Sequence, residues 1–126
     1  MIRSSRRFRW AGGWAALITV CAWGFGEAAL GRGWRVDAVD LDPGMVAHLG
    51  ARVPAIASRT GSMAALPYPD GAFDSIVACF SINHADHPAR VAEELRRVAR
   101  PGGRIAASVW PWQPTAMNSL WGEIMA

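Results

Sequence analysis

One stretch of the chain constrains the fold more than any other. Val36 to Val39 has the apolar, β-branched character of a short buried strand. Asp40 and the turn residues Pro43-Gly44 follow it, and Met45 to Leu49 then predicts a helix. In an open parallel sheet, ligands lie outside the carboxyl ends of the strands, where a carboxylate can accept hydrogen bonds from a ribose diol. Asp40 is therefore the first candidate binding residue.

Two acids flank Leu41, and we expect different roles for them. Asp42 stands immediately before Pro43, which is the position from which an acid caps a following helix. For Asp42 the capping role is favoured over a ligand role. For Asp40, at the strand end itself, the ligand role is favoured over the capping role.

The length and the charge restrict the possible functions. With 126 residues, the chain is expected to form one domain over 1–126. The net charge is +3, but four of the thirteen arginines lie within residues 1–9, which leaves nine arginines against ten acids in the rest of the chain. A nearly neutral body argues against a nucleic-acid surface, which needs clustered cations.

The cysteines and histidines do not predict a metal site. Cys21 and Cys79 are far apart in the sequence, form no Cys-x-x-Cys pair, and are expected to be buried free thiols in a reducing, cytoplasmic compartment. His84, Asp86 and His87 lie close together, but a complete site needs three or four ligands and no further cluster exists.

Residues 1–25 do not follow the pattern of the rest of the chain. Residues 1–9 are polar and rich in arginine, and residues 10–26 carry no charge, a combination that also resembles an export signal or a membrane anchor. Seventeen uncharged residues are at the short limit for crossing a bilayer. We favour a buried strand Ala16–Cys21, a turn at Gly24 and Gly26, and a helix Glu27–Leu30, with no membrane partner; disorder is the third alternative.

The remaining segments alternate between strands and helices. Strands are expected at Val36–Asp40, weakly at Val53–Ala57, at Ser75–Phe80 and at Arg104–Trp110, and helices at Val46–Arg52, Pro88–Ala99 and Thr115–Met125. This alternation predicts an α/β fold with a doubly wound, mostly parallel sheet. The end of the strand Ser75–Phe80 should open onto the same crevice as Asp40.

Three motifs in this sequence resemble those of a known family. Gly33 to Met45, Leu66 to Asp74 and Glu94 to Gly103 occur in the order and with the spacing of the class I S-adenosylmethionine-dependent methyltransferases, in particular the type 11 group. The resemblance covers about Glu27 to Trp110. It implies a Rossmann-like methyltransferase fold, here incomplete at the C-terminus, S-adenosyl-L-methionine as cofactor, and a small-molecule acceptor.

The resemblance also implies roles for individual residues. Asp40 matches the acid that binds the ribose hydroxyls, Leu41 lies against the adenine, Ser62-Met63 match the adenine-binding position, and Phe80 lines the methionine part. The family has no universal catalytic base, so no catalytic residue is assigned. His84 follows the strand at a position where it could accept a proton, or it is a loop histidine without a chemical role.

The sequence departs from the family pattern at two cofactor positions. Thr19, Cys21 and Trp23 stand where the family has glycines that let the backbone approach the methionine moiety. A tryptophan there would fill the site, unless a shift of one to three residues lets Gly24 and Gly26 bind the cofactor. Ser62 replaces the acid that usually accepts the adenine amino group.

These departures leave a second function open. The chain also ends before the last two strands of the family pattern, which suggests a truncated or partly misread remnant that no longer binds the cofactor well. A nicotinamide-dependent dehydrogenase would share the role of Asp40, but it needs Gly-x-Gly-x-x-Gly and only Gly24-Phe25-Gly26 is present.

Overall fold

The computed structural model describes residues 14–19 and 23–109. The arginine-rich beginning of the chain, Cys21 and the expected helix Thr115–Met125 lie outside the described residues.

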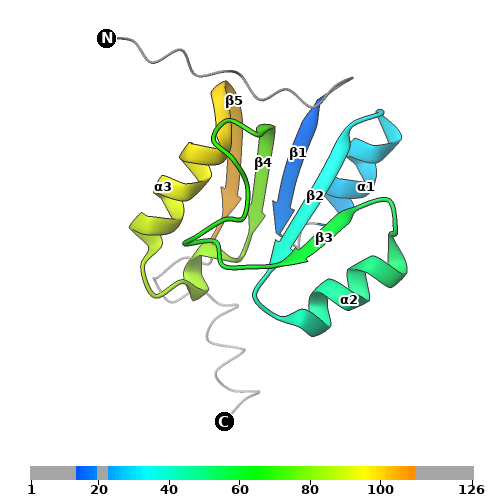
Figure 1. Ribbon diagram of the computed structural model, residues 1–126, viewed down its shortest axis with the longest axis horizontal. Coiled ribbons are helices and arrows are strands. Elements are labelled where there is room, and N and C mark those ends of the chain that lie inside the picture. Colours follow the sequence, from blue (N-terminus) through cyan, green and yellow to red (C-terminus); the bar gives the residue numbers. More distant parts are fainter. Residues whose placement is uncertain (1–13, 20–22, 110–126) are drawn as a thin grey trace, which may run out of the picture.

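The described residues form a five-stranded sheet with the strand order β3-β2-β1-β4-β5, and every neighbouring pair is parallel. The elements follow one another as β1 (Ala15–Thr19), α1 (Trp23–Gly31), β2 (Arg35–Asp40), α2 (Pro43–Arg52), β3 (Ala57–Thr60), β4 (Phe73–Cys79), η2 (Ile82–His84), α3 (Pro88–Val98) and β5 (Ala99–Ser108). Figure 1 shows β1 in the middle of this order, between β2 and β4. All five of its residues are buried, which explains its continuous apolar sequence.

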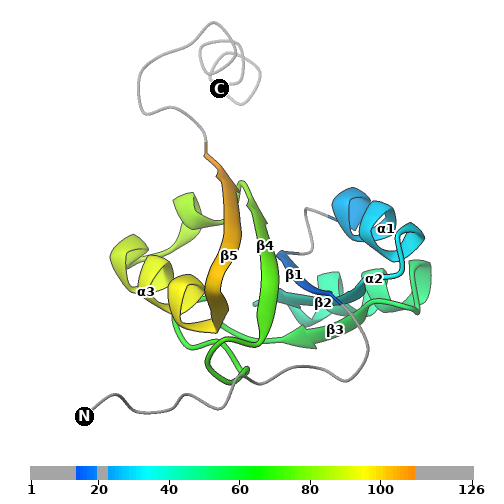
Figure 2. The same ribbon diagram turned by 90° about the horizontal axis from the view of Figure 1, so that it is seen from above.

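Helices cover both faces of the sheet. In Figure 2, α1 and α2 lie on one face and α3 lies on the other. The first face packs around Ile18, Val36, Leu49 and Ile56, and the second around Leu17, Phe73, Ile76 and Leu95. The predicted doubly wound, parallel α/β fold is thus confirmed. The strand order reverses between β1 and β4, and this switch point is where an open parallel sheet offers a ligand site at its carboxyl edge.

Helix α1 begins earlier than predicted. The sequence suggested a turn at Gly24 and Gly26, but both glycines lie inside the helix Trp23–Gly31. A Cβ atom on Gly26 would stand 2.8 Å from Ile18 Cδ1 and 2.9 Å from Ile56 Cδ1. The glycine therefore allows the helix to approach the sheet closely, which is a packing reason that a turn interpretation missed.

The capping role predicted for Asp42 is confirmed. Its Oδ1 accepts a hydrogen bond of 2.8 Å from the Gly44 N–H, and α2 begins at Pro43 with that proline in its first turn. An acid that accepts the free amide of a first turn stabilises the helix start.

The weak strand predicted at Val53–Ala57 is wrong. Val53 instead caps the end of α2, the Ile56 N–H bonds to the Val53 carbonyl, and β3 starts at Ala57. The side chains of Val53 and Ile56 are buried in a turn, which explains their apolar character. Pro54 between them has no N–H to donate to a neighbouring strand. α3 and β4 agree with prediction to within two residues at each end, with Phe80 just after β4, and β5 begins at Ala99, five residues earlier than predicted.

Within the described ranges, no helix is long and apolar enough to cross a membrane.

Candidate functional site

The carboxyl ends of the three strands β2, β3 and β4 bring predicted binding residues to one edge of the sheet. Asp40 is the last residue of β2, Thr60 ends β3 immediately before Gly61 and Ser62, and Phe80 follows β4. The strand register pairs Asp40 with Thr60. Residues that are up to 40 positions apart in the sequence therefore share this edge, as expected for a parallel sheet.

Asp40 is partly buried and held by its own turn. Its Oδ1 accepts a hydrogen bond of 2.8 Å from the Asp42 N–H, and its carbonyl accepts one of 2.8 Å from the Gly61 N–H. Among the described residues, no donor contacts the second carboxylate oxygen, Oδ2. The carboxylate is thus oriented by one oxygen and can accept a ligand hydroxyl with the other.

Exposed apolar side chains gather after the same strand ends. Leu41 is 71% exposed, and Met45 and Phe80 are 37% and 41% exposed. Such side chains are more often buried, and Leu41 and Phe80 directly follow the ends of β2 and β4 at the carboxyl edge of the sheet.

Phe80 also has an unusual backbone. Its φ is +49°, which makes it the only non-glycine residue with positive φ in the described part of the chain. For a bulky residue this conformation costs of the order of 1 to 3 kcal/mol and persists only where the surrounding structure fixes it. Its N–H bonds to the Ser108 carbonyl at 2.9 Å, so β5 helps to fix the backbone after β4.

Ser62 and Met63 begin the loop that follows β3. The Ser62 hydroxyl accepts a hydrogen bond of 3.1 Å from the Ala64 N–H, and the Ser62 carbonyl accepts one of 3.1 Å from the Ala65 N–H. Met63 packs against the core that lies under α3. The serine oxygen is therefore used to form a turn, whereas an acid would leave an acceptor for an adenine amino group.

Two of the residues that replace the family glycines, Thr19 and Trp23, lie within the described residues. Thr19 is buried, and its Oγ1 accepts a hydrogen bond of 3.2 Å from the Cys79 N–H, which joins the ends of β1 and β4 at the switch point. Trp23 packs against the core between the sheet and the helices α1 and α2, with the Arg52 guanidinium 4.5 Å from its ring centroid. Cys21 lies outside the described residues.

Gly24 and Gly26 have different surroundings in α1. Gly24 is in the first helical turn, where backbone N–H groups have no partner within the helix, and an added Cβ would meet nothing within 4 Å. Gly26 faces Ile18 and Ile56. Of the two, only Gly24 leaves open space beside its backbone.

Polar groups without partners lie near the ends of β4 and β5. Ser81 Oγ and Ser108 Oγ are buried, and neither atom forms a hydrogen bond within the described ranges. His84 is exposed at the end of η2. Buried hydroxyls are usually hydrogen-bonded, so these two groups are candidates for contact with a polar ligand. No group of three or more potential metal ligands occurs in the part of the chain that the structure describes.

Two features of the site were not predicted from the sequence. The Thr19 bond and the left-handed backbone of Phe80 both depend on strands that are distant in sequence, and no local pattern indicates them. The sequence motifs identified which residues reach the edge but not how their backbones are fixed there.

Comparison with known proteins identifies a family for this chain. A family model described as a methyltransferase domain matches residues 20–107. A Beutenbergia cavernae protein named demethylmenaquinone methyltransferase is 35% identical over 92 residues, which cover 69% of this chain and 38% of that protein. A Mycolicibacterium smegmatis protein named probable S-adenosylmethionine-dependent methyltransferase is 40% identical over 74 residues, covering 59% of this chain and 29% of that protein. The chain thus spans well under half the length of these relatives.

Solved structures share the fold. A chain from the complex of the Haloferax volcanii Trm112 methyltransferase activator superposes with a TM-score of 0.74 at 23% identity, covering 89% of this chain and 52% of that chain. A SAM-dependent methyltransferase from Aquifex aeolicus gives a TM-score of 0.65 at 23% identity, covering 82% of this chain and 60% of that chain. The family match over residues 20–107, with the shared fold in agreement, shows that this chain belongs to the methyltransferase domain family.

Proposed function

We propose that this chain binds S-adenosylmethionine at the carboxyl edge of its sheet and transfers the methyl group to a small-molecule acceptor. The observation that carries the proposal is the geometry of Asp40, whose Oδ1 is fixed by the Asp42 N–H while Oδ2 accepts no hydrogen bond from any described residue. Oδ2 has two lone pairs, so it can accept hydrogen bonds from the ribose diol while the bond to Oδ1 keeps the carboxylate oriented. The name of the Beutenbergia cavernae relative supports a small-molecule acceptor.

The ribose and adenine half of the donor fits the residues present. Asp40 binds the ribose, and Leu41, which is 71% exposed, covers the adenine. Ser62 and Met63 form the turn beside which the base lies. The Ser62 hydroxyl is uncharged and already accepts one hydrogen bond from the Ala64 N–H, so we expect weaker recognition of the adenine amino group than an acid would give. Losing one charge-assisted hydrogen bond lowers affinity by roughly ten- to hundredfold.

The methionine half fits less completely. Phe80 lines it with a partly exposed ring, and the first turn of α1, near Gly24, is a helix start of the kind that suits a carboxylate. Gly26 contributes packing rather than contact with the donor. Trp23 packs against Arg52 and the core between α1, α2 and the sheet, which supports a donor site that the indole leaves free.

When bound, S-adenosylmethionine supplies a methyl group on a sulfonium that leaves as a neutral thioether. The protein contributes by holding donor and acceptor in line, so that proximity supplies most of the rate. We assign no catalytic base. A proton released by the acceptor can pass to the exposed His84 or to water. The free thiol of Cys79 suits a cytoplasmic location.

Titration of the purified chain with S-adenosylhomocysteine, followed by calorimetry and thermal unfolding, tests the proposal. A ligand at a hundredfold its Kd adds about 2.7 kcal/mol of stability. Asp40→Asn is the informative variant, because asparagine can still accept the Asp42 N–H but loses the charge, and we expect about a tenfold or greater loss of affinity. Asp42→Asn is the matched control, since asparagine also caps helices well.

The second candidate function is a remnant that has kept the fold and lost the donor. The substitutions at Thr19 and Ser62 favour it. No stabilisation of the wild-type chain by millimolar S-adenosylhomocysteine would favour this alternative and count against the enzyme. Equal affinities for the wild-type and Asp40→Asn chains would show that the donor, if bound, does not use Asp40.

A further inference from the structure

The connection between β3 and β4 is a loop without a helix. Residues 61–72 run from the carboxyl end of β3 past α3 to the start of β4 (Figure 1). The loop buries Leu66 and Tyr68 in the core under α3. Its first residues, Ser62 and Met63, stand at the proposed adenine position. A loop without regular hydrogen bonding keeps one shape only if other elements fix it, so what fixes this loop affects the binding edge.

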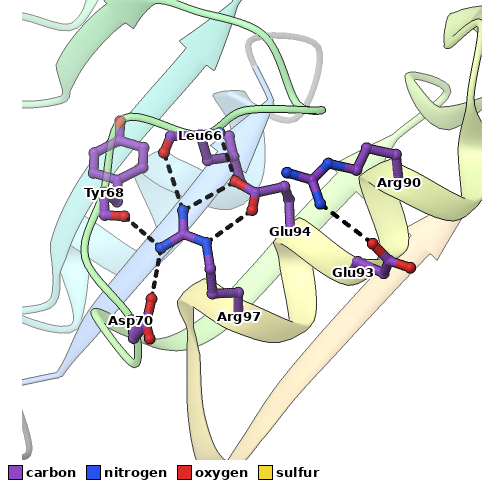
Figure 3. A network of polar contacts seen from close by, with 7 residues as sticks. All are labelled: Leu66, Tyr68, Asp70, Arg90, Glu93, Glu94 and Arg97. Atoms are coloured by element: carbon purple, nitrogen blue, oxygen red, sulfur yellow. Dashed lines mark hydrogen bonds and ion pairs between the residues drawn. The ribbon is translucent and has the colours of Figure 1, made fainter.

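Two side chains of α3, Glu94 and Arg97, hold the middle and the end of the loop. Glu94 Oε2 accepts a hydrogen bond of 2.8 Å from the Leu66 N–H. Arg97 donates to the Leu66 carbonyl at 3.1 Å, to the Tyr68 carbonyl at 2.8 Å and to the Asp70 carboxylate at 2.8 Å. Arg97 also donates to both carboxylate oxygens of Glu94, at 2.8 and 2.9 Å. Figure 3 shows the guanidinium between Glu94 and the three loop residues.

This Glu94–Arg97 pair is coupled to the binding edge through a few bonds. Leu66 directly follows the turn in which Ala64 and Ala65 donate hydrogen bonds to Ser62. Before that turn, the Gly61 N–H donates to the carbonyl of Asp40. A displacement of Leu66 would therefore move the Ser62 turn against Asp40.

We propose that Glu94 and Arg97 are positioning residues for the adenine half of the donor site. They act through the loop, holding Leu66 and thereby the turn from Ser62 to Ala65, and they do not touch the donor themselves. This inference rests on the proposed function. It goes beyond it by assigning a role in base recognition to two residues of a helix that lies behind the loop.

The same helix provides a matched control pair. Arg90 and Glu93 are also three residues apart and form an ion pair of 3.4 Å, visible beside the first pair in Figure 3. Their side chains are 56% and 70% exposed, whereas the Glu94 side chain is only 7% exposed. In the described part of the chain, the side chains of Arg90 and Glu93 form no hydrogen bond with the loop. Substitutions of Arg90 and Glu93 change the charge of the helix by the same amount as the same substitutions of Arg97 and Glu94, but they remove no hydrogen bond to residues 61–70.

The test compares two ligands on the full chain. S-adenosylhomocysteine and S-inosylhomocysteine differ only in the base, where an oxo group replaces the adenine amino group. Binding of both is measured by calorimetry for the wild type, for Glu94→Gln and Arg97→Lys, and for the controls Glu93→Gln and Arg90→Lys, at a temperature where circular dichroism shows each chain folded. Hydrogen exchange of the amides of residues 62–66 is measured in parallel without ligand.

We expect Glu94→Gln and Arg97→Lys to lose about tenfold in affinity for the adenosyl ligand, the size of effect that one charge-assisted hydrogen bond produces. Their preference for the adenosyl over the inosyl ligand should shrink, and amides 62–66 should exchange faster. The controls should match the wild type in all three measurements.

Three results would overturn the proposal. Unchanged affinities and base preference in Glu94→Gln and Arg97→Lys would refute it and leave the proposed function intact. An equal loss for both ligands, with the preference preserved, would indicate a purely structural role. Failure of the wild-type chain to bind either ligand would refute the proposed function and this inference together.

Discussion

The buried carboxylate of Glu94 should make the stability of this chain sensitive to acid. The hydrogen bond from Arg97 is the largest cause that lowers its pKa, followed by the bond from the Leu66 N–H, and together they outweigh burial and bring the pKa from 4.5 to about 2. Because one pH unit of pKa difference corresponds to 1.36 kcal/mol, this difference contributes about 3 kcal/mol of stability at neutral pH.

The sign follows from the direction of the shift. The folded-state pKa lies below the unfolded-state value, so the contribution is complete above about pH 4.5 and is lost as the pH falls toward 2. By pH 3, about 2 kcal/mol of it should be gone. The pKa of Arg97 is raised by the same contact, chiefly by its bond with Glu94, and this is not an additional contribution.

Urea unfolding of the wild type and of Glu94→Gln at several pH values between 7 and 3 measures this effect. Glutamine does not titrate, while the other carboxyl groups are common to both chains and cancel. We expect the wild type to be more stable at pH 7 and the difference to shrink by about 2 kcal/mol at pH 3. A difference that stays constant with pH would show that the carboxylate of Glu94 is not selectively stabilised in the folded state.

Two further substitutions test the packing. Gly26→Ala should be less stable than Gly24→Ala by about 1 to 3 kcal/mol in urea unfolding. The Cβ added at Gly26 would stand 2.8 Å from Ile18 Cδ1, whereas the Cβ added at Gly24 would meet nothing within 4 Å. Equal stability of the two variants would contradict the close packing of α1 on the sheet. Tyr68→Phe should change the unfolding free energy by less than about 1 kcal/mol, because the buried Tyr68 hydroxyl has no hydrogen-bond partner within the described ranges. Burial raises the pKa of Tyr68 to about 12, so the hydroxyl remains neutral. A loss of several kcal/mol would reveal a hydrogen bond.

The order of the elements could be predicted because its causes are local. A continuous apolar run such as Ile76 to Ala78, the cap at Asp42 and the turn residues before β4 act over a few positions. Parallel strands then bring their carboxyl ends to one edge, so Asp40 could be assigned to that edge without coordinates. The roles of Leu41, Ser62, Met63, Phe80 and Gly24 toward a donor remain proposals for the binding experiments.

The sequence by itself determined that this chain is a doubly wound α/β domain with an acid at the carboxyl edge of its sheet, because hydrophobic periodicity and turn chemistry depend on neighbouring residues. Only the tertiary structure decided that α1 packs through Gly26 and that Phe80 adopts a left-handed backbone. It also decided that Glu94 and Arg97 hold a loop that lies up to 31 residues away. These features arise where distant segments meet, and the free energy of such contacts depends on distances that no local pattern specifies.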